Sequence, residues 1–134
     1  MSRAAASPRH NSLTLDTVRR RSPLSEDQIH RAVATYLDLV LAPEATYTTV
    51  PGGHRTMTIA PGYRSGFPDI LIIARGQAFC IELKRPGKKA EAHQRAVHET
   101  LRRCGAPVAV CTSVEEVAGT LDGWRIPTRG GIAV

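Results

Sequence analysis

Two short segments of the chain place charged side chains at the ends of apolar runs. The first is a Pro-Asp dipeptide ending at Asp69, which leads into an apolar run, and the second is a Glu-x-Lys motif at Glu82 and Lys84. An Arg-Gly dipeptide at 75–76 separates the two runs and predicts a β-hairpin with a two-residue turn. In the register that such a turn imposes, Asp69 directly faces Glu82.

The chemistry follows from this predicted pairing. Side chains alternate along a strand, so Lys84 lies on the same face as Glu82. Two facing carboxylates repel each other, and a divalent cation removes that penalty. We expect oxygen ligands with no His or Cys nearby on this face, which favours Mg²⁺ over Zn²⁺. Lys84 could then stabilise charge on a phosphate or ease hydroxide formation, as phosphodiester hydrolysis requires. The alternative is a structural salt bridge between Lys84 and one of the acids.

A helix is predicted to begin the folded part of the chain. Ser25 and Gln28 have the spacing of a capping box, and Leu24 and Ile29 that of a hydrophobic staple. The helix should run from Glu26 to about 41. Its apolar positions at helical spacing are Ile29, Val33, Tyr36, Leu37 and Val40.

The rest of the chain alternates between strand and helix patterns. In chain order we expect two strands within 45–60 around a Gly-rich turn at 51–53, a loop at 61–67, strands at 69–74 and 78–84, a helix from about 88 to 104, a strand at 108–111, a helix capped by Ser113, and an edge strand at 124–126. The strand, helix and strand from 78 to 111 form a right-handed βαβ unit. The sequence therefore predicts an α/β fold.

Composition limits the class of protein. A chain of 134 residues with 42% hydrophobic and 22% charged residues fits one compact domain. No apolar run is long enough for a membrane span, and the three cysteines lack zinc-ligand spacing. We therefore expect a cytoplasmic protein that does not bind membranes.

The net charge of +6 is unevenly distributed. Residues 1–24 hold five Arg and one acidic residue, together with Ser, Ala and Pro, which predicts a disordered basic N-terminal arm. Such an arm could contact nucleic acid non-specifically, and an organellar transit peptide is the alternative. Residues 25–134 form the predicted domain.

The ordered set of motifs resembles the VRR-NUC (virus-type replication-repair nuclease) domains of the PD-(D/E)XK nuclease superfamily. The resemblance covers nearly everything from Ser25 to about Ile126. Its motifs are Ser-Glu at 25–26, Gly-Phe-Pro-Asp at 66–69, Ile-Glu-Leu-Lys-Arg-Pro-Gly at 81–87, Gln94, Gly105, and Ser-x-Glu-Glu at 113–116. Each motif alone is weak, but their order and spacing together are specific. The resemblance implies a restriction-endonuclease-like αβββαβ core, in which a mixed central sheet is flanked by helices.

The resemblance also implies roles for individual residues. Asp69, Glu82 and the backbone carbonyl of Leu83 correspond to the metal ligands, and Lys84 to the catalytic lysine. Glu26 matches an acidic residue that reaches the metal directly or through water, although an acid at the first helical position is also favoured by the helix dipole. Gln94 matches a glutamine beside the site, with a hydrogen-bonded boundary residue as the alternative.

Further residues are weaker candidates. His30 follows Glu26 by one helical turn, but a glutamine occupies its position in many relatives and an ordinary boundary histidine is the alternative. Residues expected to bind nucleic acid, or else to be solvated loop residues, are His54, Arg55, Tyr63, Arg64, Lys88 and Lys89.

The expected function is a Mg²⁺-dependent DNA endonuclease, with Mn²⁺ as a substitute. Small stand-alone domains of the family resemble resolvases of Holliday junctions or other branched DNA in replication and repair. Resolving a junction needs two symmetric cuts, so a homodimer is expected. The alternatives are a flap- or single-strand-directed nuclease, a restriction-like enzyme, and a non-catalytic DNA-binding module.

Overall fold

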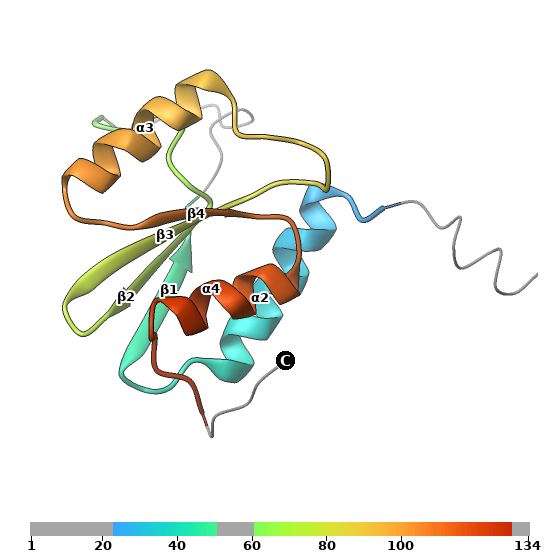
Figure 1. Cartoon of the computed structure of the whole chain (residues 1–134), viewed down its shortest axis with the longest axis vertical. Helices are drawn as coiled ribbons and strands as arrows, with labels where there is room; N and C mark the ends of the chain where they lie inside the picture. The colour runs from blue at the N-terminus through green and yellow to red at the C-terminus, as the bar shows by residue number, and fades with distance from the viewer. Residues whose placement is uncertain (1–22, 51–60, 130–134) are drawn as a thin grey trace, which may run out of the picture.

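The structure is a computed structural model that describes residues 23–50 and 61–129 (Figure 1). Its elements are α2 (Glu26–Val40), β1 (Ala45–Thr49), β2 (Ile70–Ala74), β3 (Gln77–Leu83), α3 (Ala92–Arg103), β4 (Val108–Cys111) and α4 (Val114–Gly123). None of the helices in these two segments is long and apolar enough to span a membrane.

The four strands form one mixed sheet in the order β1-β2-β3-β4. The β1–β2 and β2–β3 pairs are antiparallel, and β3–β4 is parallel through the α3 crossover. Helix α3 covers one face of the sheet, while α2 and α4 lie on the other (Figure 1). The predicted α/β fold, with a mixed central sheet flanked by helices, is confirmed.

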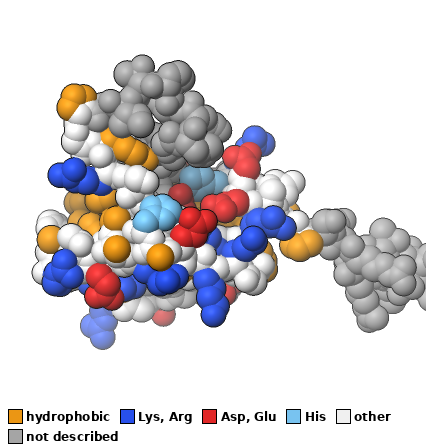
Figure 2. Space-filling model, turned by 90° about the horizontal axis from the view of Figure 1, so that it is seen from above, with side chains coloured by type: hydrophobic (Ala, Val, Ile, Leu, Met, Phe, Trp, Pro, Cys, Tyr) orange, Lys and Arg blue, Asp and Glu red, His pale blue; other side chains and the backbone are white. Residues whose placement is uncertain are grey.

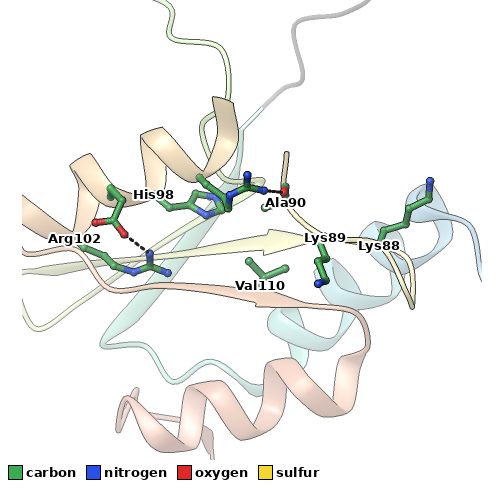
Figure 3. A pocket seen from close by; sticks show the side chains of 8 residues that line it. Lys88, Lys89, Ala90, His98, Arg102 and Val110 are labelled. Atoms are coloured by element: carbon green, nitrogen blue, oxygen red, sulfur yellow. Dashed lines mark hydrogen bonds and ion pairs between the residues drawn. The ribbon is translucent and has the colours of Figure 1, made fainter. Parts of the chain in front are cut away.

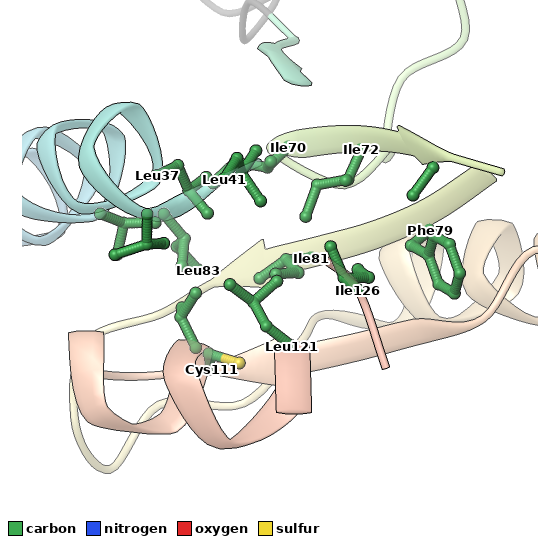
Figure 4. Packing of buried hydrophobic residues seen from close by; sticks show 14 of the residues in the cluster. Leu37, Leu41, Ile70, Ile72, Phe79, Ile81, Leu83, Cys111, Leu121 and Ile126 are labelled. Carbon is green, nitrogen blue, oxygen red and sulfur yellow. The ribbon is translucent and has the colours of Figure 1, made fainter. Parts of the chain in front are cut away.

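The hydrophobic core lies between the sheet and the α2–α4 layer. Ile72, Ile81 and Leu83 point into it with no more than 1% of their surface exposed, and they pack with Leu37 and Leu121 from the helices (Figure 4). Because side chains alternate along β3, residues 80 and 82 must then face α3. The core thus occupies one face of the sheet and leaves the other for polar groups.

Helix α2 forms as its sequence predicts. The Ser25 hydroxyl accepts a hydrogen bond from the Gln28 N–H at 3.1 Å, and the Gln28 side chain accepts one from the Ser25 N–H at 2.8 Å. These reciprocal bonds satisfy two backbone donors at the helix start. All the apolar positions predicted to be buried are buried except Tyr36, which is only partly buried.

The β2–β3 hairpin has the predicted register, with Ala74 paired to Gln77 and Ile70 paired to Ile81. Its turn residues 75 and 76 both have positive φ, at 54° and 72°, as a type I′ turn requires. Gly76 adopts this conformation without strain. A turn of this length leaves one register available, and that register brings Asp69 next to Glu82.

Helix α3 starts later than predicted. It begins at Ala92 instead of about 88, because Gly87 has a φ of 85° and the chain turns there, with the Lys88 N–H donating to the Arg85 carbonyl. Glu91 then serves as the N-cap and forms a capping box with Gln94. Glutamate is not among the residues preferred at N-caps, so this helix start is harder to identify from sequence.

The edge strand expected at 124–126 does not form. Trp124 instead caps α4, Arg125 has a φ of 58°, and the Ile126 N–H donates to the Leu121 carbonyl. This tight turn buries Ile126 in the core. The apolar residues at this position therefore cover the sheet without extending it.

Two predictions concern segments outside the described residues. These are the basic arm, of which residues 1–22 are not described, and the second strand and Gly-rich turn expected within 51–60.

Candidate active site

Asp69 lies immediately before β2 and reaches across to β3. Its Oδ2 accepts a hydrogen bond of 2.7 Å from the Leu83 N–H. Because the N–H and C=O of a strand residue point to the same side of the strand, the Leu83 carbonyl is directed toward the Asp69 side as well. The structure thus places one carboxylate and one backbone carbonyl at the same end of the hairpin.

Glu82 is the second carboxylate and is only 1% exposed. The Gln94 Nε2 donates to its Oε2 at 3.2 Å, and the His98 Nε2 lies 3.3 Å from its Oε1. Both donors come from one face of α3, since they are four residues apart. Helix α3 therefore fixes the orientation of the Glu82 carboxylate.

The surroundings of Glu82 disfavour its charged form. Burial is the largest cause, followed by the charge of Asp69 and a hydrogen bond with it, so that the pKa of Glu82 rises to about 9. The nearby Lys84 charge acts in the opposite direction and Glu26 adds a smaller upward effect. Two carboxylates share this site, and a cation bound between them would offset the cost of ionising both.

His98 was not predicted from the sequence as part of the site, and the expectation that no histidine lies near the carboxylates is wrong. Burial, together with the charges of Arg102 and Lys84, lowers the pKa of His98. A lowered pKa favours the neutral imidazole, so the contact between His98 and Glu82 is a hydrogen bond and not an ion pair. The available signal was its position one turn after Gln94.

Lys84 is buried, with 8% of its surface exposed, and its backbone N–H donates to the Cys111 carbonyl. Among the described residues its ammonium forms no ion pair within 4.0 Å. The alternative, a structural salt bridge between Lys84 and either Asp69 or Glu82, is therefore not formed. An ammonium on a largely buried residue, close to two acids but paired with neither, is placed to act on a bound group.

Gln94 connects the start of α3 to the site. Its Oε1 accepts the Glu91 N–H at 2.8 Å, while its Nε2 contacts Glu82. The loop before β2 packs on the same helix at Gly66, whose φ is 91°. A side chain at Gly66 would lie 3.1 Å from His93 and Val97. This close approach sets the position of α3 relative to the segment that carries Asp69.

Glu26 and His30 lie on α2. Glu26 is exposed at the first helical position, and its charge is close enough to raise the pKa of Glu82. The structure brings it near the carboxylates without a direct contact. The His30 Nε2 is buried and has no hydrogen-bond partner in the part of the chain that the structure describes. No hydrogen bond therefore joins this nitrogen to the described acidic residues.

The predicted nucleic-acid-binding residues that the structure describes lie at the surface. They are Tyr63, Arg64, Lys88 and Lys89, and all are exposed. Seen from the α3 side, Lys and Arg side chains surround a patch of acidic and histidine side chains (Figure 2). His54 and Arg55 lie outside the described residues.

Comparison with known proteins decides the family. The VRR-NUC domain family matches residues 38–115, which is more than half of the chain and includes β1 to β4. The chain belongs to the VRR-NUC family. Membership makes it a nuclease-type domain that processes DNA.

Solved VRR-NUC structures have the same fold. One, titled "VRR_NUC domain", is 24% identical with a TM-score of 0.53, and the match covers 75% of this chain and 97% of that one. Another, titled "VRR_NUC domain protein", is 22% identical with a TM-score of 0.61 and coverages of 75% and 88%. No curated protein matches the chain.

The donor atoms of this VRR-NUC site suit a hard cation. Two carboxylates and one backbone carbonyl supply oxygen only, and Mg²⁺ is typically bound by one or two carboxylates with water and substrate oxygens completing its shell. Within residues 23–50 and 61–129, no group of three or more His, Cys, Asp and Glu side chains is arranged to hold a metal ion. The oxygen donors that are present suit Mg²⁺, which keeps several waters in its shell.

Proposed function

We propose that this VRR-NUC domain is a Mg²⁺-dependent endonuclease that hydrolyses phosphodiester bonds in branched DNA, with Mn²⁺ able to replace Mg²⁺. Asp69, Glu82 and the Leu83 carbonyl would hold the cation, and Lys84 would act on the phosphate. The observation that carries the proposal is the pairing of Asp69 with a buried Glu82 beside an ammonium that lacks an ion-pair partner among the described residues.

Each side chain then has a distinct task. A bound Mg²⁺ would supply a Lewis acid for the phosphate oxygens and an activated water. Lys84 would stabilise the negative charge that develops on the phosphate, since a positive charge surrounded by largely buried residues acts more strongly than one in bulk water. Gln94 and His98 hold Glu82 in one orientation. Glu26 would reach the metal through water.

The proposed preference for branched DNA rests on the resemblance to small stand-alone VRR-NUC domains, and the proposed homodimer rests on symmetry. The described part of one chain carries a single candidate site, whereas resolving a four-way junction needs two cuts related by a two-fold axis. Two copies of the chain would supply them. The same residues would serve a flap- or single-strand-directed nuclease or a restriction-like enzyme. These activities are therefore distinguished by which DNA substrates are cut.

A panel of DNA substrates tests the proposed specificity. We expect purified protein with Mg²⁺ to nick a mobile four-way junction at paired, symmetric positions, and to cut linear duplex and single strands at least about 10-fold more slowly. Mapping the cut positions on each labelled strand is the measurement. Faster cutting of a flap or of single strands would replace branched DNA with the alternative substrate. Binding without cutting of any substrate would favour the non-catalytic module.

A further inference from the structure

A hollow adjoins the candidate active site on the α3 side of the sheet. It has a volume of about 340 Å³ and lies where α3, β4 and the loop before α3 meet (Figure 3). Its floor is formed by Val110, which is 40% exposed, and by the buried His98. The nuclease site described above does not use this space.

The walls of the hollow are strongly basic. The described residues that line it include the cations Lys88, Lys89, Arg95 and Arg102, and among them Glu99 alone is acidic. Apart from His98, the described charged residues that line the hollow are four cations and one acid, which leaves an excess of three positive charges. Such an excess in a concave site attracts an anion.

Backbone contacts hold the two guanidinium groups in place. The Arg95 Nη1 donates to the Ala90 carbonyl at 2.6 Å, and the Arg102 Nη2 donates to the Val108 carbonyl at 3.0 Å. Arg102 also lies 3.6 Å from Glu99, whose side chain is 66% exposed. An arginine has five N–H donors, so each group keeps donors for a ligand. Fixed guanidinium groups lose little entropy when they bind a phosphate.

The hollow is next to the candidate catalytic carboxylate. Val110 on its floor is the register partner of Glu82, one strand away across the β3–β4 ladder. His98 separates the two spaces, because it lines the hollow and also contacts Glu82. Only the side chain of His98 would therefore separate a group bound in the hollow from a group bound at Glu82.

We infer that this basic hollow, formed by Lys89, Arg95 and Arg102, binds a second phosphate group of the DNA strand whose neighbouring phosphodiester is cut. The inference rests on the proposed function, since it names where the substrate strand is held. The phosphate could be an internal phosphodiester or a terminal phosphomonoester, because both present the same oxygens to the guanidinium groups. Holding it would fix the position of the strand over Glu82 and Lys84.

The test measures DNA binding without metal, so it does not depend on cleavage. In EDTA, Arg102→Gln should weaken binding about 10-fold at low salt. The slope of log K against log salt should become shallower by about 0.9, the value for one lost phosphate contact. Lys89→Gln makes the same test at a lysine that also lines the hollow. Arg103→Gln is the matched control, because it removes the same charge from the same helix outside the hollow.

Two DNA ends separate the sources of the phosphate. Each protein is assayed with DNA that carries either a 5′-phosphate or a 5′-hydroxyl. A loss in Arg102→Gln and Lys89→Gln that is equal for both ends assigns the hollow to an internal phosphodiester, and a loss confined to phosphorylated DNA assigns it to a terminal phosphate. Equal behaviour of Arg102→Gln, Lys89→Gln and Arg103→Gln would overturn the inference. Failure to cut DNA while these binding differences persist would reject only the proposed nuclease activity.

Discussion

Replacing Lys84 with methionine is expected to slow DNA cleavage by about 10²- to 10³-fold at saturating DNA and Mg²⁺, because the phosphate loses a preorganised positive charge. Methionine retains the apolar stem of the lysine at a position where only 8% of the residue is exposed. The chain should therefore still fold. Single-turnover kinetics measure the cleavage step separately from DNA binding.

A metal titration separates this role from metal binding. Lys84 is not among the proposed ligands, and its positive charge favours ionised Glu82 by lowering that residue's pKa. Its direct repulsion of a cation opposes this effect, so Mg²⁺ affinity should change much less than the cleavage rate. Lys88→Met removes a charge from an exposed lysine and should affect DNA affinity only. An unchanged cleavage rate in Lys84→Met would contradict the assignment.

Replacing Glu82 with glutamine is expected to abolish Mg²⁺-dependent cleavage and at the same time to stabilise the metal-free protein. The cleavage loss should be about 10³-fold or more, because a bound metal contributes several kcal/mol to phosphate hydrolysis. Near pH 8 the metal-free wild type must take up a proton at Glu82 as it folds, because burial raises the pKa of this carboxyl to about 9. An amide needs no such proton, so the substitution should raise the free energy of unfolding by about 1–4 kcal/mol. The substituted amide has nearly the same shape as the carboxylate, so the packing around it should be kept.

The pH dependence of this stabilisation has a defined sign. Burial raises the pKa of Glu82 in the folded protein, so its contribution to stability is complete below its ordinary pKa and is lost as pH rises toward about 9. The wild-type Tm should fall relative to that of Glu82→Gln between about pH 5 and about pH 9. Mg²⁺ should restore the Tm of the wild type at high pH and should not raise that of the variant.

Thermal unfolding in EDTA and in Mg²⁺ across this pH range provides the measurement. Glu44→Gln is the matched control, since Glu44 is exposed in the turn before β1. A variant that is less stable than the wild type at every pH would show that Glu82 has a structural role. It would also remove the physical argument that the buried carboxylate pair requires a cation.

The sequence predicted the site's hairpin because local rules determine it. A two-residue Arg-Gly turn permits one register, and alternation along β3 then places Glu82 and Lys84 on one face. The first helix was equally predictable, because the side chains of Ser25 and Gln28 each accept a hydrogen bond from the other residue's backbone N–H. These features depend on neighbours in the chain and on no distant contact.

The missed features depend on tertiary contacts. The only local signal for His98 is its position one turn after Gln94, and it belongs to the site because α3 packs over β3. The basic hollow likewise requires β4 to pair with β3 and leave Val110 partly exposed beside Arg102. The 124–126 segment has a strand-like composition, but a turn stabilised by contacts with α4 buries Ile126 instead.

The central claim is that Asp69 and Glu82 bind the metal that cleaves DNA, and cleavage by Asp69→Asn tests it most directly. The wild type and the control Asp122→Asn, which alters an exposed residue of α4, are assayed beside it with Mg²⁺ and with EDTA. We predict that the wild type and Asp122→Asn cut only with Mg²⁺, and that Asp69→Asn cuts in neither condition. Cleavage by Asp69→Asn at the wild-type rate, or wild-type cleavage in EDTA, would contradict the account.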